Sequence, residues 1–349
     1  MRILAPILSL STHTRRMMAA CLLLSIAIVA CTRKEEATPK PQGVGEDSKQ
    51  AATLCHGSVT NILPRIALAQ GFFAAEGLNV TLKDMTDGKL AFEGLLSGEC
   101  DYAVNGAPPI VLHEPQQAKF TILATVMADD DSAKIIARRD HGITTPQDLK
   151  GKRIAIKQGI IGHLFLDLFM MKHGLGPNDV IQVPMEPGEF QAALVSGQID
   201  GFAMTNKLIN AAAKTLGEKS VVFAEPGLNT IYGFLTTRTD SPQGQKLTSQ
   251  LLKALIRAER FAKSDPASAK TVLAEAYKFS AQEVEGIWTR TTIEVALANT
   301  IFVNLEDQYK WQVERGFSQG FASPPNFLDV VSPSYLRAIK PEAVSVVKQ

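Results

Sequence analysis

Four turns of this chain place uncharged hydrogen-bonding side chains between a β-rich run and a helical pattern, at residues 58–61, 105–109, 158–163 and 204–207. Hydroxyl, amide and imidazole groups donate and accept hydrogen bonds, and no set of nucleophile, base and acid occurs in these turns. The residue types therefore favour reversible binding of a small molecule over catalysis. The candidate ligand-binding residues are Thr60, Asn61, Asn105, Gly106, Ala107, Gln158, Gly162, His163, Thr205 and Asn206.

Each candidate also has a structural interpretation. Thr60 or Asn61 suits the N-cap of the helix that follows. Gly106 allows close backbone approach, and the prolines after it leave N–H groups unpaired at a helix entry. His163 either contacts a ligand or packs at a helix start, and Lys207 either neutralises an anion or points to solvent.

The N-terminal 30 residues have the three-part layout of an export signal. Arg2, Arg15 and Arg16 supply positive charge, and residues 17–30 form an apolar run whose one polar member is a serine. This run is short for a membrane span and typical of a cleavable signal. The sequence Ile-Val-Ala-Cys that ends at Cys31 resembles a bacterial lipobox, so we expect Cys31 to carry lipid. An ordinary signal peptide or an uncleaved anchor is the alternative.

The charge balance gives no sign of a nucleic-acid partner. The first 30 residues hold three of the 36 basic residues and none of the 35 acidic ones, so the remainder is close to neutral. Residues 31–50 are almost free of large apolar side chains and read as a flexible tether. The six histidines show no ligand spacing and no CxxC occurs, so we expect neither a metal nor another cofactor.

Two cysteines remain in the part of the chain expected to fold outside the cytoplasm. Cys55 and Cys100 could form a disulfide there if their Cα atoms approach within about 7 Å. They could equally be two small buried residues at the starts of strands. The sequence leaves both options open.

From residue 51 onward, short β-rich runs alternate with helical patterns, which is typical of βαβ units. The two stretches LLSGECDYAV and LVSGQIDGFA echo each other, each ending a helix at a glycine and starting a strand after an aspartate. We expect Asp101 and Asp200 to cap backbone N–H groups in those turns. From Pro242 the chain is mainly helical, and we expect Trp288 and Trp311 to pack between helices.

An ordered set of motifs resembles the solute-binding proteins of ABC importers for nitrate, taurine and aliphatic sulfonates. The set spans about residues 55 to 347 and consists of ALAQGFFAAEGLNV, LLSGECDYAVNGAPP, TTPQDLKGKRIAI, GLGPNDVIQVPM, AALVSGQIDGFAM and PNFLDVVSPSYLRAIKPEAVSVV. The resemblance implies an α/β, two-lobe periplasmic binding protein fold of type II. In that fold each lobe is a mainly parallel sheet flanked by helices, and a hinge with two crossovers joins the lobes.

The same resemblance implies lobe boundaries and a function. Lobe one would be residues 51–130 plus 228–349, and lobe two residues 133–224. A monomer anchored by lipid outside the cytoplasm would capture a small molecule in the cleft, where helix N-termini present N–H groups, and deliver it to a permease and its ATPase. The alternatives are an enzyme of the pyrimidine-precursor type or a ligand-sensing module on the same fold.

Two departures from the family pattern bear on the ligand. Sulfonate-binding relatives typically have hydroxyl residues where Ile160 and Ile161 stand. Relatives also often have an aromatic residue, an acid and a proline where Thr205 and Asn206 stand. The first of these differences disfavours a small oxyanion and favours a partly apolar ligand.

Overall fold

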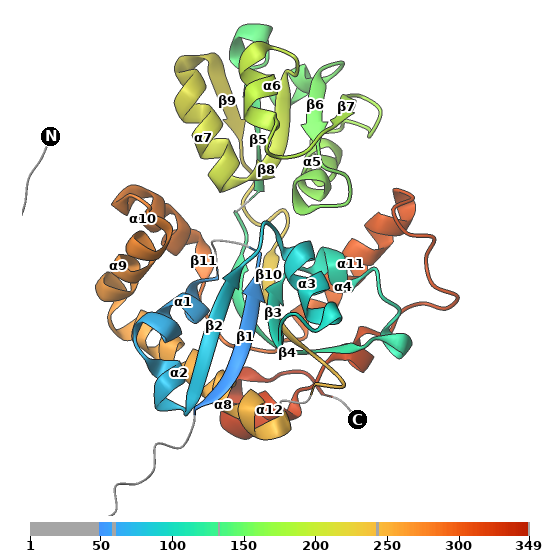
Figure 1. The fold of residues 1–349 in the computed structure, drawn as a ribbon. Helices are drawn as coiled ribbons and strands as arrows, with labels where there is room; N and C mark the ends of the chain where they lie inside the picture. The colour runs from blue at the N-terminus through green and yellow to red at the C-terminus, as the bar shows by residue number, and fades with distance from the viewer. Residues whose placement is uncertain (1–48, 58–60, 132, 242–243, 348–349) are drawn as a thin grey trace, which may run out of the picture. The chain divides into compact units, whose positions relative to one another are not determined.

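The computed structural model describes residues 49–57, 61–131, 133–241 and 244–347. The predicted signal segment, Cys31, Thr60 and nearly all of the tether lie outside these residues. The described chain forms two β-sheets, each with helices packed on it (Figure 1). We call the six-stranded sheet with its helices lobe one, and the five-stranded sheet with its helices lobe two.

Lobe one is built on a sheet with the strand order β11-β4-β10-β3-β1-β2. Strand β1 is parallel to β2 and to β3, as βαβ connections require, whereas β10 runs antiparallel to β3 and β4. The strands are β1 Gln50–His56, β2 Leu78–Asp84, β3 Tyr102–Asn105, β4 Phe120–Asp129, β10 Ile231–Arg238 and β11 Thr291–Thr292.

Helices cover both faces of the lobe-one sheet. Helices α1, α2, α8, α9 and α12 pack among themselves on one side, and α3, α4 and α11 gather on the other (Figure 1). The α-helices are α1 Ile62–Ala69, α2 Phe72–Ala75, α3 Gly88–Ser97, α4 Ala107–Ile110, α8 Gly244–Ser264, α9 Pro266–Tyr277, α10 Ala281–Arg290, α11 Thr300–Glu314 and α12 Ser334–Ile339. Short 3-10 turns occur at Pro115–Gln117, Phe327–Val330 and Pro341–Ala343.

Lobe two has the strand order β7-β6-β8-β5-β9, with β6 parallel to β7 and β8. Its elements are β5 Ala133–Arg138, β6 Arg153–Ile156, α5 Ile161–Lys172, β7 Ile181–Pro184, α6 Phe190–Ser196, β8 Gly201–Thr205, α7 Asn206–Leu216 and β9 Ser220–Phe223, with 3-10 turns at Arg139–His141, Pro146–Leu149 and Gly217–Lys219. One apolar cluster packs beneath α5, and a second beneath α6 and α7 on the opposite face.

The chain passes from the first sheet to the second after β4 and returns before β10, which gives two crossovers. Every antiparallel pair in the two sheets includes β4, β5 or β10, the strands next to these crossovers. The remaining pairs are parallel, as the predicted α/β fold requires. The two-lobe α/β fold class is therefore confirmed, and the exact lobe boundaries stay a prediction. The expectation of mainly parallel sheets is wrong, because two of five strand pairs in lobe one and two of four in lobe two are parallel.

Both aspartates of the repeated motif accept backbone N–H groups, as predicted, but these groups belong to neighbouring strands and not to the turns. Asp101 Oδ2 accepts from the Thr53 amide at 2.8 Å, and Asp200 Oδ2 accepts from the Arg153 amide at 2.9 Å. The preceding glycines end their helices in the left-handed conformation. Each aspartate thereby joins the start of its own strand to a neighbouring parallel strand.

The disulfide that the sequence left open is present in the structure. Cys55 lies in β1 and Cys100 lies just before β3, and their Cα atoms are 5.9 Å apart. Because β1 and β3 are parallel neighbours, the bond joins adjacent strands of the lobe-one sheet. Both residues are buried.

Candidate functional site

Of the first predicted turn, residues 58–61, the structure describes only Asn61. Thr60 lies outside the described residues. Asn61 directly precedes α1 and is buried. Its side chain makes no capping hydrogen bond to the first turn of α1, so the capping interpretation does not hold for Asn61. A ligand contact for Asn61 stays a prediction.

In the second turn, Asn105 ends β3 and helps to hold lobe one together. Its Oδ1 accepts from the Thr236 hydroxyl at 2.9 Å, and its Nδ2 donates to the Gly106 carbonyl at 3.0 Å. Thr236 lies on β10, so the amide joins neighbouring strands. One N–H of Asn105 then remains for a ligand, beside the backbone of Gly106 and Ala107 at the start of α4.

The third turn brings α5 very close to β8. A Cβ atom placed on Gly162 would lie 2.3 Å from the carbonyl oxygen of Ala203. Glycine at 162 is therefore required by packing, whatever its role toward a ligand. Gln158 is exposed, and Ile160 and Ile161 are half-buried at the entry to α5.

His163 is 2 % exposed and lies where the two lobes touch. The Gly159 amide donates to its Nδ1 at 3.4 Å, which places the ring proton of the neutral imidazole on Nε2. Its ring packs against Trp311 and Phe317 of lobe one, with centroids 5.3 and 5.2 Å away. Burial lowers the pKa of His163 and Arg315 acts in the same direction, whereas Asp167 opposes this change. A neutral, N–H-donating imidazole results.

Trp311 is buried between helices, as expected, and its hydrogen-bond partner lies in lobe two. Its indole Nε1 donates to Asp167 of α5 at 2.7 Å. Trp288 behaves as expected, since it packs against the lobe-one core, with the Lys270 ammonium 5.6 Å from its ring centroid. The sequence cannot distinguish the two tryptophans, because both occupy helical patterns and their partners are distant in the chain.

The fourth turn connects lobe two to the hinge. Asn206 is 7 % exposed, and its Nδ2 donates to the Asp131 carbonyl at 2.9 Å, at the first crossover. Its Oδ1 has no partner among the described residues. Thr205 precedes α7 without capping it through its side chain. Lys207 is exposed, in agreement with its solvent interpretation.

The hinge end of β4 carries a buried ion pair. Asp129 is fully buried, and its Oδ2 accepts from Arg290 Nε at 2.9 Å while its Oδ1 accepts from the Asp131 amide at 3.0 Å. Burial raises the pKa of Asp129 despite these favourable partners. A buried pair of this kind fixes the geometry of the crossover more than it stabilises the fold.

Helix α11 supplies a row of amide side chains that the sequence analysis missed. Asn304, Gln308 and Gln312 recur every four residues and so share one helix face. Asn304 Nδ2 donates to the Thr230 carbonyl at 3.0 Å, Gln308 Nε2 to Asn304 Oδ1 at 3.3 Å, and Gln312 Nε2 to the Pro108 carbonyl at 3.2 Å. Because a carbonyl only accepts, this series of hydrogen bonds fixes the orientations of the three amides. Gln308 Oε1 is left without a partner among the described residues. The four-residue spacing is the signal that could have revealed the row.

Buried polar atoms without a partner gather in this region. Eight such side-chain atoms occur among the described residues. Seven of the eight belong to residues next to the two crossovers, to His163 and its neighbour Gln182, or to α11. The eighth belongs to Gln250 on α8. The seven are Asp131 Oδ1, His163 Nε2, Gln182 Nε2, Asn206 Oδ1, Asn229 Nδ2, Thr291 Oγ1 and Gln308 Oε1. Native proteins pair nearly all such atoms with protein groups, ordered water or a ligand, so this region is the candidate site.

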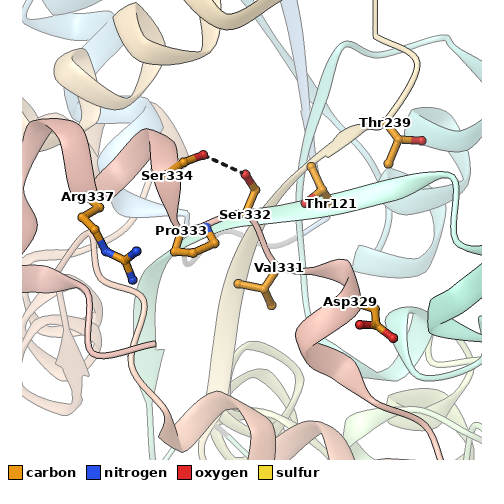
Figure 2. A pocket seen from close by; sticks show the side chains of 8 residues that line it. All are labelled: Thr121, Thr239, Asp329, Val331, Ser332, Pro333, Ser334 and Arg337. Carbon is orange, nitrogen blue, oxygen red and sulfur yellow. Dashed lines mark hydrogen bonds between the residues drawn. The ribbon is translucent and has the colours of Figure 1, made fainter. Parts of the chain in front are cut away.

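A separate hollow of about 350 Å³ lies at the other end of β4 and β10 (Figure 2). Its polar side chains are largely engaged already: Arg337 donates to the Val346 carbonyl, Thr121 to the Val330 carbonyl at 3.2 Å, and the hydroxyls of Ser332 and Ser334 are 3.3 Å apart. None of the predicted ligand-binding residues lines this hollow. We therefore place the candidate site at the hinge and α11 instead.

Within the part of the chain that the structure covers, no group of three or more histidine, cysteine, aspartate or glutamate side chains is arranged to hold a metal ion. Among those same residues, no helix has both the length and the apolar character of a membrane span.

Comparison with known proteins gives relatives that are named as binding proteins. A Brucella abortus protein named as a binding protein is 24 % identical over 228 residues, covering 63 % of this chain and 69 % of the relative. The taurine-binding periplasmic protein of Escherichia coli is 29 % identical over 152 residues, covering 43 % of this chain and 47 % of the relative.

Solved structures show the same fold. The periplasmic aliphatic sulphonate binding protein SsuA of Escherichia coli matches with a TM-score of 0.68 at 17 % identity, covering 81 % of this chain and 92 % of SsuA. A desulfurization enzyme, DszB, in complex with biphenyl-2-sulfinic acid matches with a TM-score of 0.63 at 18 % identity, covering 83 % of this chain and 98 % of DszB. The shared fold thus hosts both binding proteins and an enzyme.

The family model described as NMT1/THI5 like matches residues 60–269, which is more than half of the chain. The match runs from the first predicted turn through all of lobe two and α8 and into α9. It therefore includes the His163 and Asn206 turns and both hinge crossovers. This chain belongs to the NMT1/THI5-like family.

Proposed function

We propose that this chain is the solute-binding component of an ABC importer and works outside the cytoplasm. A small molecule binds between lobe one and lobe two, and the liganded protein docks on a permease with its ATPase. The observation that carries the proposal is the group of buried polar atoms at the hinge and on α11 that have no hydrogen-bond partner among the described residues. A bound solute supplies the missing partners. The family match and the binding-protein relatives support the same role.

The solute is organic and partly apolar. Ile160 and Ile161 flank the N-terminus of α5, where sulfonate-binding relatives have hydroxyl groups. Arg315 and Lys157 already pair with carboxylates, so neutral groups dominate the polar contacts. The unpaired Gln308 Oε1 accepts a hydrogen bond, which favours a solute with an N–H or O–H group.

An enzymatic role is disfavoured by the cysteines. The DszB structure shows that an enzyme can use this fold, so the alternative is a serious one. Cys55 and Cys100 are joined in a disulfide, and neither is available as a nucleophile in the described chain. The buried polar groups around the hinge are mainly amides, with a neutral imidazole, one hydroxyl and one carboxylate oxygen, a set that suits recognition better than acid–base catalysis.

Three further parts of the proposal concern the whole protein. Cys31 carries a lipid that anchors the chain to the membrane. Residues 51–130 with 228–349 and residues 133–224 act as the two lobes. The protein binds its solute as a monomer.

The deciding experiment is a thermal-shift screen followed by mass spectrometry of the bound compound. Alkanesulfonates, aromatic acids and pyrimidines are compared with nitrate and sulfate. A true ligand present at a hundred times its Kd raises the free energy of unfolding by about 2.7 kcal/mol. Recovery of the compound unchanged supports binding, whereas a chemically altered compound would establish the enzyme alternative.

Replacement of Gln308 tests the site itself. We expect Gln308→Leu to raise the Kd of the ligand about tenfold, because the lost acceptor leaves a ligand donor buried and unpaired. Gln250→Leu is the matched control, since Gln250 also has an unpaired Oε1 but lies on α8. Equal affinities of the two variants, measured by calorimetry, would remove α11 from the site.

A further inference from the structure

One carboxylate of lobe two binds two side chains of lobe one. Asp167 on α5 accepts from Trp311 Nε1 at 2.7 Å and from Arg315 Nε at 2.7 Å, and a second Arg315 nitrogen bonds its other oxygen. Trp311 lies near the end of α11, and Arg315 is the first residue after that helix. We call Asp167, Trp311 and Arg315 the clasp.

The clasp is largely shielded from solvent. The side chains of Asp167 and Arg315 are 10 % and 22 % exposed, and Trp311 is 8 % exposed. A two-pronged arginine–carboxylate pair is geometrically specific, and screening by salt is weaker at a partly buried pair than at an exposed one. The other contact between charges of the two lobes, Lys157 with Asp87, is longer at 3.9 Å and more exposed. The clasp is therefore the stronger of these two connections.

The clasp also positions a predicted ligand residue. Asp167 Oδ2 lies 3.8 Å from Nε2 of His163, one helical turn away. The His163 ring rests against Trp311 and Phe317, whose own rings are 5.5 Å apart. Formation of the clasp thus brings the indole against the imidazole and fixes the direction of the His163 N–H.

We propose that Asp167 is a positioning residue for solute capture: it holds α5 of lobe two against α11 of lobe one and so favours the closed form of the protein. A bond between lobes exists only when they are together, so its free energy contributes to the closed state alone. The lobes are thereby partly preorganised for the solute, and loss of the clasp lowers apparent affinity by reducing the closed fraction. The link to affinity rests on the proposed function, whereas the effect on closure does not.

The test measures the distance between the lobes without any solute. Met171 on α5 and Val303 on α11 are 69 % and 62 % exposed, so cysteines there accept spin labels. The full chain is used, with Cys21 and Cys31 replaced by serine so that no other thiol is labelled. Asp167→Asn, Trp311→Phe and Arg315→Gln are compared by pulsed electron resonance. Asp179→Asn is the matched control, because Asp179 pairs with Lys150 of its own lobe.

We expect each clasp variant to lower the ratio of short to long label distances by about tenfold, and Asp179→Asn to leave it unchanged. Trp311→Phe keeps an aromatic ring and changes no charge, while it removes the N–H donor and part of the ring surface, so it carries the test if a charge variant folds poorly. The proposal would be overturned if all three variants gave the same label distances as the labelled parent protein with its clasp intact.

The two proposals fail in different ways. If no solute binds, the proposed function fails, and the distance ratios still report on the clasp. If a solute binds with the same affinity and dissociation rate to Asp167→Asn as to the parent protein, Asp167 has no role in capture, and the solute-binding function stands.

Discussion

At position 162, the absence of a methyl group determines how closely α5 approaches β8. The Ala203 carbonyl occupies the space that a Cβ atom would need, at 2.3 Å. We expect Gly162→Ala to lower the free energy of unfolding by about 1–3 kcal/mol, because backbone rather than a flexible side chain must move. Gly188→Ala is the control, since no atom lies within 4 Å of its added carbon. Chemical denaturation compares them, and similar losses in both would contradict the close approach.

Asp200 gives lobe two an acid-sensitive contact. Arg153 and His141 surround its carboxylate and lower its pKa below the ordinary value of 3.8, even though burial alone would raise it. A carboxyl group with a lowered pKa stabilises the fold above its ordinary pKa, and this stabilisation is lost as the pH falls through the folded value. We therefore expect Asp200→Asn to destabilise the protein near neutral pH and to make little difference in strong acid. Thermal melts over that range test this, and a constant difference at every pH would refute it.

Some residue roles could be predicted from the sequence and others could not. The repeated motif of glycine, aspartate and strand predicts that Asp101 and Asp200 accept backbone N–H groups. It does not predict their partners, which lie 48 and 47 positions away on neighbouring strands. Trp311 and Asp167 are 144 positions apart in the chain, so nothing local indicates their contact. Predicted Asn105 lies as expected at the end of a strand, but its side chain is used within lobe one.

At the scale of elements, the disulfide between β1 and β3 closes a segment of 45 residues. Loop-closure entropy predicts a stabilisation of about 4 kcal/mol for such a segment. We expect the double replacement of Cys55 and Cys100 by alanine to lower the midpoint of urea unfolding accordingly. Reductant should have no effect on that variant and should weaken the parent protein, and an unaffected parent would argue against the bond.

Helices and strands were predictable where apolar residues recur at a regular spacing, but the residues at which they begin and end were not. The apolar spacing of residues 63–76 predicts one helix, but the structure has α1 and α2 separated at Gly71, which adopts a positive φ of 68°. The amide row of α11 was missed for a different reason. Amides on a helix usually face solvent, but α11 packs against α4 and the turn at Phe327–Val330, and Gln308 and Gln312 are buried.

The whole molecule is predicted to work while tethered to a membrane. Replacement of Cys31 by serine should release the protein into the soluble fraction, because the remainder of the chain carries nearly equal numbers of acidic and basic residues. Fractionation and labelling with palmitate test this. Cys21→Ser, which alters the apolar run but not the expected lipid site, should remain bound and labelled. Membrane retention of Cys31→Ser would disprove lipidation at this residue.

The strand order of lobe one has a consequence for biosynthesis. Strand β4 ends at Asp129, yet its two neighbours, β10 and β11, begin only at Ile231 and Thr291, after all of lobe two. The chain is synthesised from its N-terminus, so lobe two can fold before lobe one is complete. During that time both edges of β4, a long apolar strand of lobe one, are unpaired. Sites for chaperones and for misassembly should therefore concentrate at β4 until the last residues arrive.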